Sequence, residues 1–138
     1  MRNNNNILLK GGRVIDPLND MDTVSDVLIL DGKISKVSRD IVTENEGIEV
    51  INVSGMVVVP GLIDCHVHLR EPGYEDKETI ETGSRAAAKG GYTTIVCEPN
   101  TNPPIDDVDK VEDLMGRIKE RGLVNIYTKT CITKGSNG

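Results

Sequence analysis

Four polar residues at alternating positions form a pattern that could hold a metal ion beside an anion. They are Asp64, His66, His68 and Arg70, and one residue separates each from the next. Because side chains alternate between the two faces of a strand, a strand over this segment places all four on one face. Two imidazoles about 6.6 Å apart along a strand can bind one ion at about 2.0–2.1 Å. A guanidinium beside them can bind a carboxylate in a bidentate manner.

The same polar face could instead meet water, as one face of an antiparallel sheet commonly does. Two observations favour the metal. The chain contains two histidines, and both lie in this segment. The elements that follow predict a parallel sheet, whose two faces are usually both covered, and burying unpaired polar groups costs roughly 2–7 kcal/mol each. A metal ion and an anionic ligand would satisfy these groups.

Residues 60–138 alternate between strand and helix patterns. The predicted strands cover 62–69, 92–97 and 124–132, and the predicted helices cover 75–89 and about 107–121. Gly122 is expected to end the second helix in the left-handed conformation. This order indicates parallel βαβ units with both helices on one face of the sheet, because such crossovers are right-handed. Arg70 then falls at the carboxyl end of the first strand, where α/β barrels place their sites.

Residues 1–59 show a different pattern, which is typical of a small all-β domain. The predicted strands cover 7–10, 14–16, 27–30, 34–37, 48–53 and 56–59. Asp31-Gly32 stands between two of them and is a strong signal for a two-residue hairpin turn. Short strands with frequent turns suit a small sandwich or sheet. The chain therefore divides into a β-rich domain over 1–59 and an α/β domain over 60–138.

The bulk composition argues against several classes of partner. The formal net charge is −6 and the pI is near 4.9, whereas nucleic-acid binding needs a clustered basic surface. No window approaches the roughly 18 apolar residues of a membrane span. The polar start MRNNNN lacks the apolar region of a signal peptide, so a cytoplasmic location is expected. Cys65, Cys97 and Cys131 fall in predicted strands and are expected to be buried free thiols.

Longer runs of the sequence resemble the N-terminal part of dihydroorotases of the amidohydrolase superfamily. The resemblance rests mainly on the run GLIDCHVHLREPGYEDKETIETGSRAAAKGGYTTIVCEPNTNPPID, and LILDGKISKV, VVVPG and ITKG extend it over nearly the whole chain. It implies an α/β fold: the first βα units of a metal-dependent (β/α)8 TIM-type barrel, preceded by a small composite β-sandwich. It also implies an activity, the interconversion of L-dihydroorotate and N-carbamoyl-L-aspartate in pyrimidine biosynthesis.

The resemblance also assigns roles to individual residues. His66 and His68 would be two ligands of a site for one or two Zn²⁺ ions, and Arg70 and Asn100 would bind the carboxylate of the small anionic substrate. Asp64 would orient a histidine from outside the ligand set. The remaining metal ligands and the catalytic aspartate of these enzymes lie further along their chains, so no catalytic residue is expected within this one.

The sequence departs from the family pattern in two ways. Glu98 replaces the usual Met two residues before Asn100, and it either faces the site or turns to solvent or pairs with a cation. The barrel is also incomplete, because a full one takes about 250 residues. The chain supplies two zinc ligands where a catalytic site normally has three. We therefore expect an N-terminal fragment that is inactive alone and leaves an apolar sheet edge unpaired.

Two alternatives remain open at this point. Hydantoinases and allantoinases, which also hydrolyse cyclic amides, share the His-x-His strand. The sequences HLREPG and EPNTNPP favour dihydroorotase over both. The chain could also be a non-catalytic structural partner of another pyrimidine-pathway enzyme, or part of a homo-oligomer. The presence of His66, His68, Arg70 and Asn100 together weighs against a purely structural role.

Overall fold

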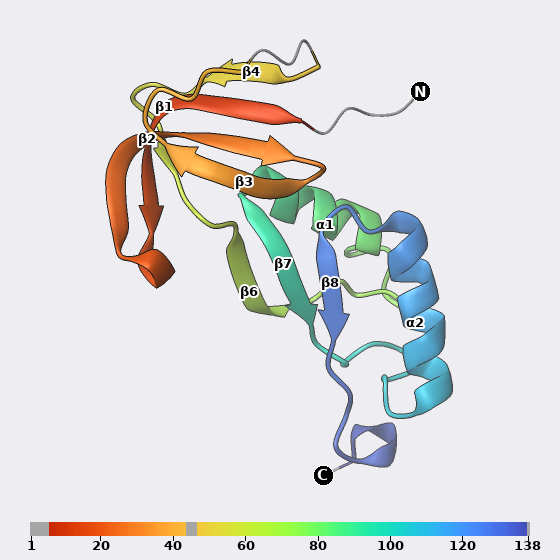
Figure 1. Ribbon diagram of the computed structural model, residues 1–138. Helices are drawn as coiled ribbons and strands as arrows, with labels where there is room; N and C mark the ends of the chain where they lie inside the picture. Colours follow the sequence, from red (N-terminus) through yellow and green to blue (C-terminus); the bar gives the residue numbers. More distant parts are fainter. Residues whose placement is uncertain (1–5, 44–46, 138) are drawn as a thin grey trace. The chain divides into compact units, whose positions relative to one another are not determined.

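The structure is a computed structural model that describes residues 6–43 and 47–137. The chain forms two compact units, Met1–Pro60 and Gly61–Gly138, and each has its own sheet (Figure 1). Residues 1–5 of the polar start lie outside the described part. No helix within the described ranges has the length and apolar character needed to cross a membrane.

The first unit is built on a five-stranded sheet. Its strands are β1 (Ile7–Asp16), β2 (Met21–Leu30), β3 (Lys33–Ser38), β4 (Glu49–Asn52) and β5 (Val57–Val58), and a short 3-10 helix η1 (Pro17–Asn19) joins the first two. Antiparallel pairing links β1 to β2 and β2 to β3, whereas β4 and β5 both run parallel to β1. The predicted hairpin is confirmed, and Asp31 and Gly32 at its turn have φ angles of 50° and 74°.

One continuous strand, β1, replaces the two strands predicted on either side of Gly11-Gly12. The pairing with β2 shifts between Leu9 and Gly12, and Gly11 has a φ of 76° there. The Gly11 N–H donates to Asp26 at 2.8 Å, and the buried Asp26 carboxylate also accepts the Ile41 N–H at 2.9 Å. Burial raises the pKa of Asp26, but these two backbone donors together with the Lys10 ammonium outweigh it and leave the pKa below its usual value. The glycines therefore produce a bulge, and the strand continues through it.

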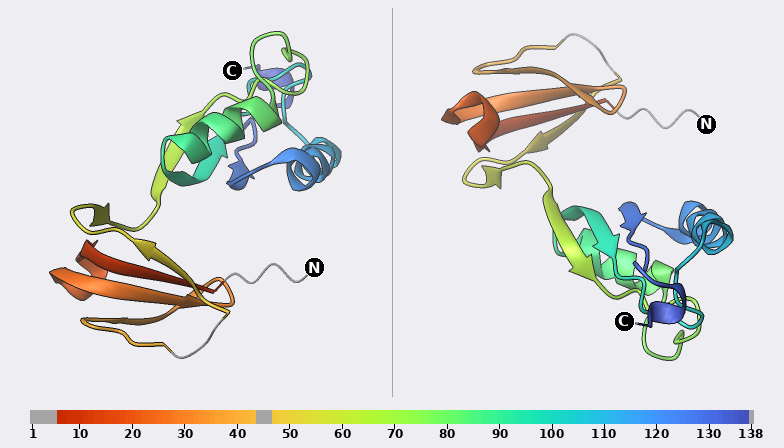
Figure 2. Two further views of the ribbon diagram at one scale, coloured as in Figure 1. Left: turned by 90° about the horizontal axis from the view of Figure 1, so that it is seen from above. Right: turned by 90° about the horizontal axis from the view of Figure 1, so that it is seen from below.

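The second unit is a three-stranded parallel sheet with two helices. Its elements in chain order are β6 (Leu62–Val67), α1 (Ile80–Lys89), β7 (Tyr92–Cys97), α2 (Val108–Arg121), β8 (Asn125–Thr128) and the 3-10 helix η2 (Lys134–Ser136). The strand order is β6-β7-β8. Both helices pack on one face of the sheet and share its core, as predicted (Figure 2). That core consists of Leu69, Ile80, Ile95, Cys97, Ile105, Leu114, Ile118 and Ile126.

The ends of several elements differ from the prediction. Helix α1 begins at Ile80 rather than at residue 75, because Thr79 caps it by accepting the Thr82 N–H while the Thr82 side chain accepts the Thr79 N–H. Gly122 is extended, with φ −71° and ψ 134°, so the left-handed cap predicted there is wrong. Strand β8 ends at Thr128 instead of residue 132.

The three cysteines are free thiols, but only Cys97 is buried. Cys65 is exposed and Cys131 is half-buried, so the expectation that all three are buried is wrong. Cys65 lies in a strand with no helix over its side chain, and Cys131 lies beyond the end of β8.

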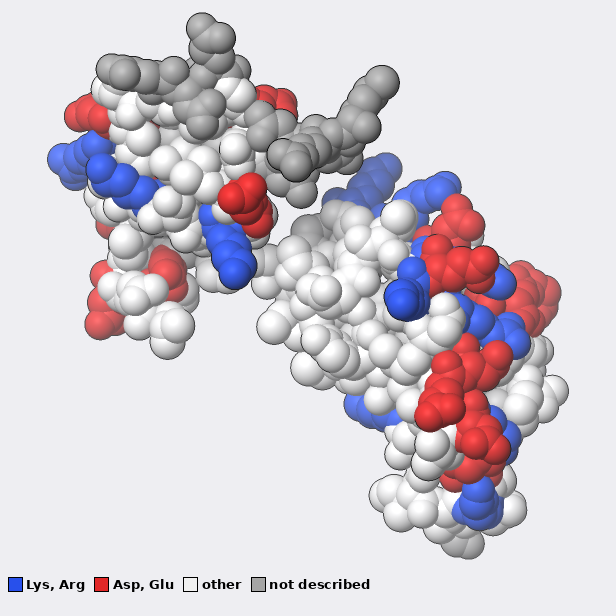
Figure 3. Space-filling view, turned by 45° about the vertical axis from the view of Figure 1, so that its right-hand side comes forward, with Lys and Arg blue, Asp and Glu red and all other residues white. Residues whose placement is uncertain are grey.

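Charged side chains of both signs gather on the outer surface of α2 (Figure 3). Arg117 pairs with Asp113 at 2.9 Å, and Lys110 pairs with Asp106 and, at 3.1 Å, with Asp107. These pairs are three or four residues apart, the spacing at which helix side chains meet. Charges of both signs are thus interleaved along this side of α2.

Candidate functional site

The two histidines lie at the carboxyl end of β6, with their ring centroids 5.3 Å apart and their planes at 69°. His66 is in the strand, and His68 follows the last strand residue, Val67. Val67 packs against the helix-side core, so His66 points to the opposite face, which no element of this unit covers. The two rings therefore lie close together at this strand end, and their binding of a common metal ion stays a prediction.

The alternation predicted for this segment does not extend to Asp64. Between Asp64 and Val67 the pairing of β6 with β7 shifts, so that the partners of these two residues are Ile95 and Cys97. Asp64 thus lies on the helix side, where it lines a hollow with residues of α1. Its Oδ1 accepts the backbone N–H of His66 at 2.9 Å. Asp64 thus holds the backbone of His66, and in the described part of the chain it forms no hydrogen bond or ion pair with either imidazole.

Asn100 meets His68 from the loop that follows β7. The distance between His68 Nδ1 and Asn100 Oδ1 is 3.0 Å. An amide oxygen only accepts hydrogen bonds, so this contact requires a ring proton on Nδ1, and in the neutral imidazole the lone pair is then on Nε2. A histidine that ligates a metal commonly donates its other ring nitrogen to an oxygen in this way. The contact prepares Nε2 of His68 to act as a ligand.

Glu98 meets His66 from the end of β7. Its Oε1 lies 3.4 Å from Nδ1 of His66 and forms an ion pair with Lys129. The hydrogen bond from the Lys129 ammonium is the main cause that holds the pKa of Glu98 below its usual value, against burial, which raises it. The sequence left open whether Glu98 faces the site, turns to solvent or pairs with a cation, and the structure places it beside His66 and paired with Lys129.

Lys129 is a residue that the sequence analysis missed. It follows β8 directly, and its backbone N–H donates to the Cys97 carbonyl at 3.0 Å, which brings it beside Glu98. Its place directly after the third parallel strand is the signal that could have identified it. Parallel strands bring their carboxyl ends to the same edge of a sheet, and residue 129 ends the third strand just as residues 68 and 98 end the first two.

Arg70 takes part in none of the side-chain contacts that link the other site residues in the described part of the chain. It lies three residues beyond the end of β6 with a φ of 63°, so strand alternation no longer determines its direction. Its carbonyl accepts the Tyr74 N–H at 3.0 Å. Within residues 6–43 and 47–137 its guanidinium makes no hydrogen bond or ion pair. The structure thus brings His66, His68, Glu98, Asn100 and Lys129 together and leaves the Arg70 side chain available to a ligand.

The donor set suits a zinc ion as part of a larger site. Imidazole nitrogen is a common zinc ligand, and a catalytic zinc normally takes three protein ligands. The two Nε2 atoms would supply two of them. Over the ranges that the structure describes, no group of three or more His, Cys, Asp or Glu side chains is arranged to hold a metal. A zinc site built on these histidines therefore needs ligands from outside those ranges.

Comparison with known proteins gives one consistent family. The Dihydro-orotase-like family model matches residues 55–138. Dihydroorotase from Citrifermentans bemidjiense is 49% identical over 133 residues, which are 96% of this chain and 31% of that protein. Dihydroorotase from Aquifex aeolicus is 46% identical over 132 residues, again 96% of this chain and 31% of that protein.

Solved structures give a related result at lower identity. The L-hydantoinase (dihydropyrimidinase) from Arthrobacter aurescens matches with a TM-score of 0.81 and 29% identity, over 90% of this chain and 27% of that one. A D-hydantoinase matches with a TM-score of 0.73, also at 29% identity, over 94% and 28% of the two chains. The chain thus spans about a third of the length of the proteins it matches. On the extent of the family match, the chain belongs to the Dihydro-orotase-like family.

Proposed function

We propose that this chain contributes the first part of a zinc-dependent dihydroorotase, which interconverts L-dihydroorotate and N-carbamoyl-L-aspartate in pyrimidine biosynthesis. The observation that carries the proposal is the pair of imidazoles at the end of β6, each with Nδ1 facing an oxygen and Nε2 left for a metal. The identity of 49% with a dihydroorotase supports the choice of substrate.

In the proposed reaction His66 and His68 hold the zinc, one ion or two, through Nε2. Zinc, when bound, supplies Lewis acidity toward the amide carbonyl of the ring. Asp64 fixes the backbone of His66, and Asn100 fixes the ring of His68, so neither imidazole has to reorganise when a ligand arrives.

The substrate carboxylate would be bound by Arg70 and Asn100. The guanidinium of Arg70 has no protein partner in the described part of the chain, and its planar fork matches a carboxylate. Asn100 uses its oxygen on His68, which leaves its amide N–H groups as donors. Asn100 would therefore contact a metal ligand and the substrate at once, which links the position of the anion to that of the metal.

The remaining parts of the site are proposed to lie outside this chain, as they do in the family. These are at least one further metal ligand and a proton-transfer residue, since no third ligand meets the histidines in the described ranges. The chain alone is therefore expected to be inactive.

A second candidate, hydrolysis of a hydantoin, is favoured by the structural match with a TM-score of 0.81 to an L-hydantoinase. The two functions differ in the charge of the substrate, because dihydroorotate carries a carboxylate for Arg70 and a simple hydantoin does not. The test is to assay the complete encoded protein, loaded with zinc, on both substrates. Turnover of dihydroorotate supports the proposal, whereas turnover of hydantoin without dihydroorotate would refute it.

A further inference from the structure

We propose that Glu98 is a positioning residue for the metal site: its carboxylate orients the imidazole of His66 through Nδ1, and Lys129 holds that carboxylate in place. The inference rests on the proposed function, because it concerns how His66 presents Nε2 to zinc. It also gives a role to the residue at which this sequence departs from the family pattern.

The backbone at the ends of three strands brings these residues together. The Glu98 N–H donates to the Val67 carbonyl at 2.9 Å, which fixes the end of β7 against the end of β6. The Lys129 N–H donates to the Cys97 carbonyl at 3.0 Å, which fixes the end of β8 against β7. His66, Glu98 and Lys129 therefore come from neighbouring strands at one edge of the sheet, and their proximity follows from strand register.

At these strand ends the Glu98 carboxylate accepts a hydrogen bond from Lys129 and lies within ion-pair distance of the His66 ring. Glu98 is 17% exposed, and the same Oε1 faces Lys129 on one side and Nδ1 of His66, at 3.4 Å, on the other. His66 is 69% exposed, so packing alone does not hold its ring. A carboxylate accepts and never donates when ionised, so it selects the tautomer with the proton on Nδ1 and the lone pair on Nε2. Carboxylate–histidine pairs of this kind orient metal ligands and raise their basicity.

Each of the two histidines faces an oxygen from a residue that follows β7. His66 and His68 are two residues apart, and so are their oxygen partners, Glu98 and Asn100. In both pairs the ring nitrogen that meets the oxygen is Nδ1. The repeated spacing indicates that the loop after β7 orients both rings, with a charged acceptor for one and a neutral acceptor for the other.

Direct coordination of the metal by Glu98 is the competing role, and the geometry disfavours it. Its oxygen lies on the Nδ1 side of His66, away from the free Nε2, and the ammonium of Lys129 is already against it. A metal cation at the same oxygen would lie beside that ammonium, and like charges repel strongly at such distances. No arrangement of Glu98 with the two histidines as a three-ligand cluster is found within the described ranges.

The test uses four variants of the complete encoded protein. Glu98→Met removes the acceptor with little change in length, Glu98→Gln keeps a neutral acceptor, and Lys129→Met releases the carboxylate from its cation. Glu112→Met is the matched control, because Glu112 is an exposed acid of α2 with no site contact. Two measurements are made: zinc affinity by competition with a chelator, and the tautomer of His66 in the metal-free protein by NMR of ¹⁵N-labelled histidine.

Glu98→Met is expected to weaken zinc binding by about 10–100-fold and to move the His66 proton from Nδ1 to Nε2. Glu98→Gln is expected to keep the Nδ1–H tautomer with a smaller loss of affinity, and Lys129→Met to fall between wild type and Glu98→Met. Glu112→Met should match wild type. Glu98→Gln also serves as the decisive variant if Glu98→Met does not fold, since a loss of the Nδ1–H tautomer there overturns the role as acceptor.

Two outcomes would contradict the role of Glu98, and a third would contradict the proposed function instead. Unchanged affinity and tautomer in Glu98→Met overturn the role of Glu98. Loss of zinc binding altogether in both Glu98 variants also overturns it, because that result makes Glu98 a ligand. A wild-type protein that binds no zinc refutes the proposed function instead, while the tautomer measurement still decides whether Glu98 orients His66.

Discussion

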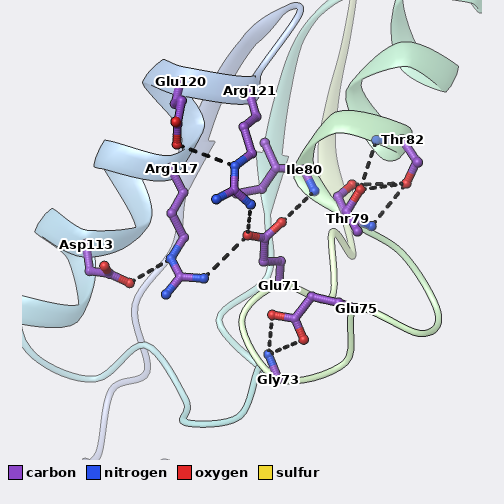
Figure 4. A network of polar contacts seen from close by, with 10 residues as sticks. All are labelled: Glu71, Gly73, Glu75, Thr79, Ile80, Thr82, Asp113, Arg117, Glu120 and Arg121. Carbon is purple, nitrogen blue, oxygen red and sulfur yellow. Dashed lines mark hydrogen bonds and ion pairs between the residues drawn. The ribbon is translucent and has the colours of Figure 1, made fainter.

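Replacing Glu71 by Gln should destabilise the loop that carries Arg70. Glu71 is 2% exposed and connects three elements (Figure 4). Its Oε1 accepts from Arg121 at 2.9 Å and from Arg117 at 3.4 Å, and its Oε2 accepts the backbone N–H of Ile80 at 3.2 Å. In Glu71→Gln the shape and one acceptor remain for Ile80. The amide N–H₂ then faces two guanidinium groups, so donors meet donors.

The size of this loss of stability depends on how exposed the two arginine partners of Glu71 are. Removing one member of a fully buried ion pair costs about 3–5 kcal/mol. The Arg117 and Arg121 side chains are 34% and 45% exposed, so water recovers part of their solvation when the carboxylate is lost. A single hydrogen bond to a charged group contributes about 1.5–3 kcal/mol. We therefore expect the free energy of unfolding to fall by about 2–3 kcal/mol.

Urea unfolding of the complete protein measures this loss, and amide hydrogen exchange at Ile80 locates it at the start of α1. Glu120→Gln is the matched control, because Glu120 approaches the same Arg121 at 3.5 Å but its side chain is 72% exposed. The control should change stability by less than about 0.5 kcal/mol. Equal, small effects of the two substitutions, with Ile80 exchange unchanged, would show that the buried carboxylate contributes no more than a surface one.

Three further predictions concern the site and the pH dependence. Arg70→Lys should raise KM for dihydroorotate more than it lowers kcat, because a point charge cannot replace the guanidinium fork; an unchanged KM in steady-state kinetics would contradict the assigned role. This chain alone should bind zinc weakly, since it offers two imidazoles, and nanomolar binding lost in His66→Ala would contradict that. The N–H and ammonium of Lys110 lower the pKa of Asp107 from 3.8 to about 2. The contribution of the Asp107 carboxylate to stability is therefore complete above its pKa in the unfolded chain, 3.8, and is lost as the pH falls toward about 2. Asp107→Asn should remove this pH dependence from urea unfolding curves.

Local signals in the sequence were sufficient for elements whose ends are set by their own residues. Tyr92–Cys97 was predicted without error because a β-branched run stands between Gly90-Gly91 and Pro99. Gly91 adopts a φ of 83° and ends the turn after α1. The second helix was predicted to within one residue because Asp107 caps it by accepting the Lys110 N–H at 3.0 Å.

Contacts distant in sequence decided the features that were missed. Residues 75–78 have helix-forming character, but the first N–H of α1 is taken by Glu71, nine residues earlier, and Thr79 completes the cap. The bulge in β6 could not be predicted from the alternation of residues along the strand either, because it depends on the register with β7. A shift of one residue in that register moves Asp64 to the helix face while His66 stays on the other.

The same register explains why the site formed although the strand prediction was wrong beyond Val67. His68 lies outside β6, so alternation alone would not keep it beside His66. Its position depends on Asn100 at 3.0 Å, just as the ring of His66 depends on Glu98 at 3.4 Å. Both partners follow β7, whose end is fixed to Val67 by the Glu98 N–H. In the proposed site the two histidines are the ligands and the neighbouring strand end orients their rings, so a substitution at residue 98 should change metal binding without altering either ligand.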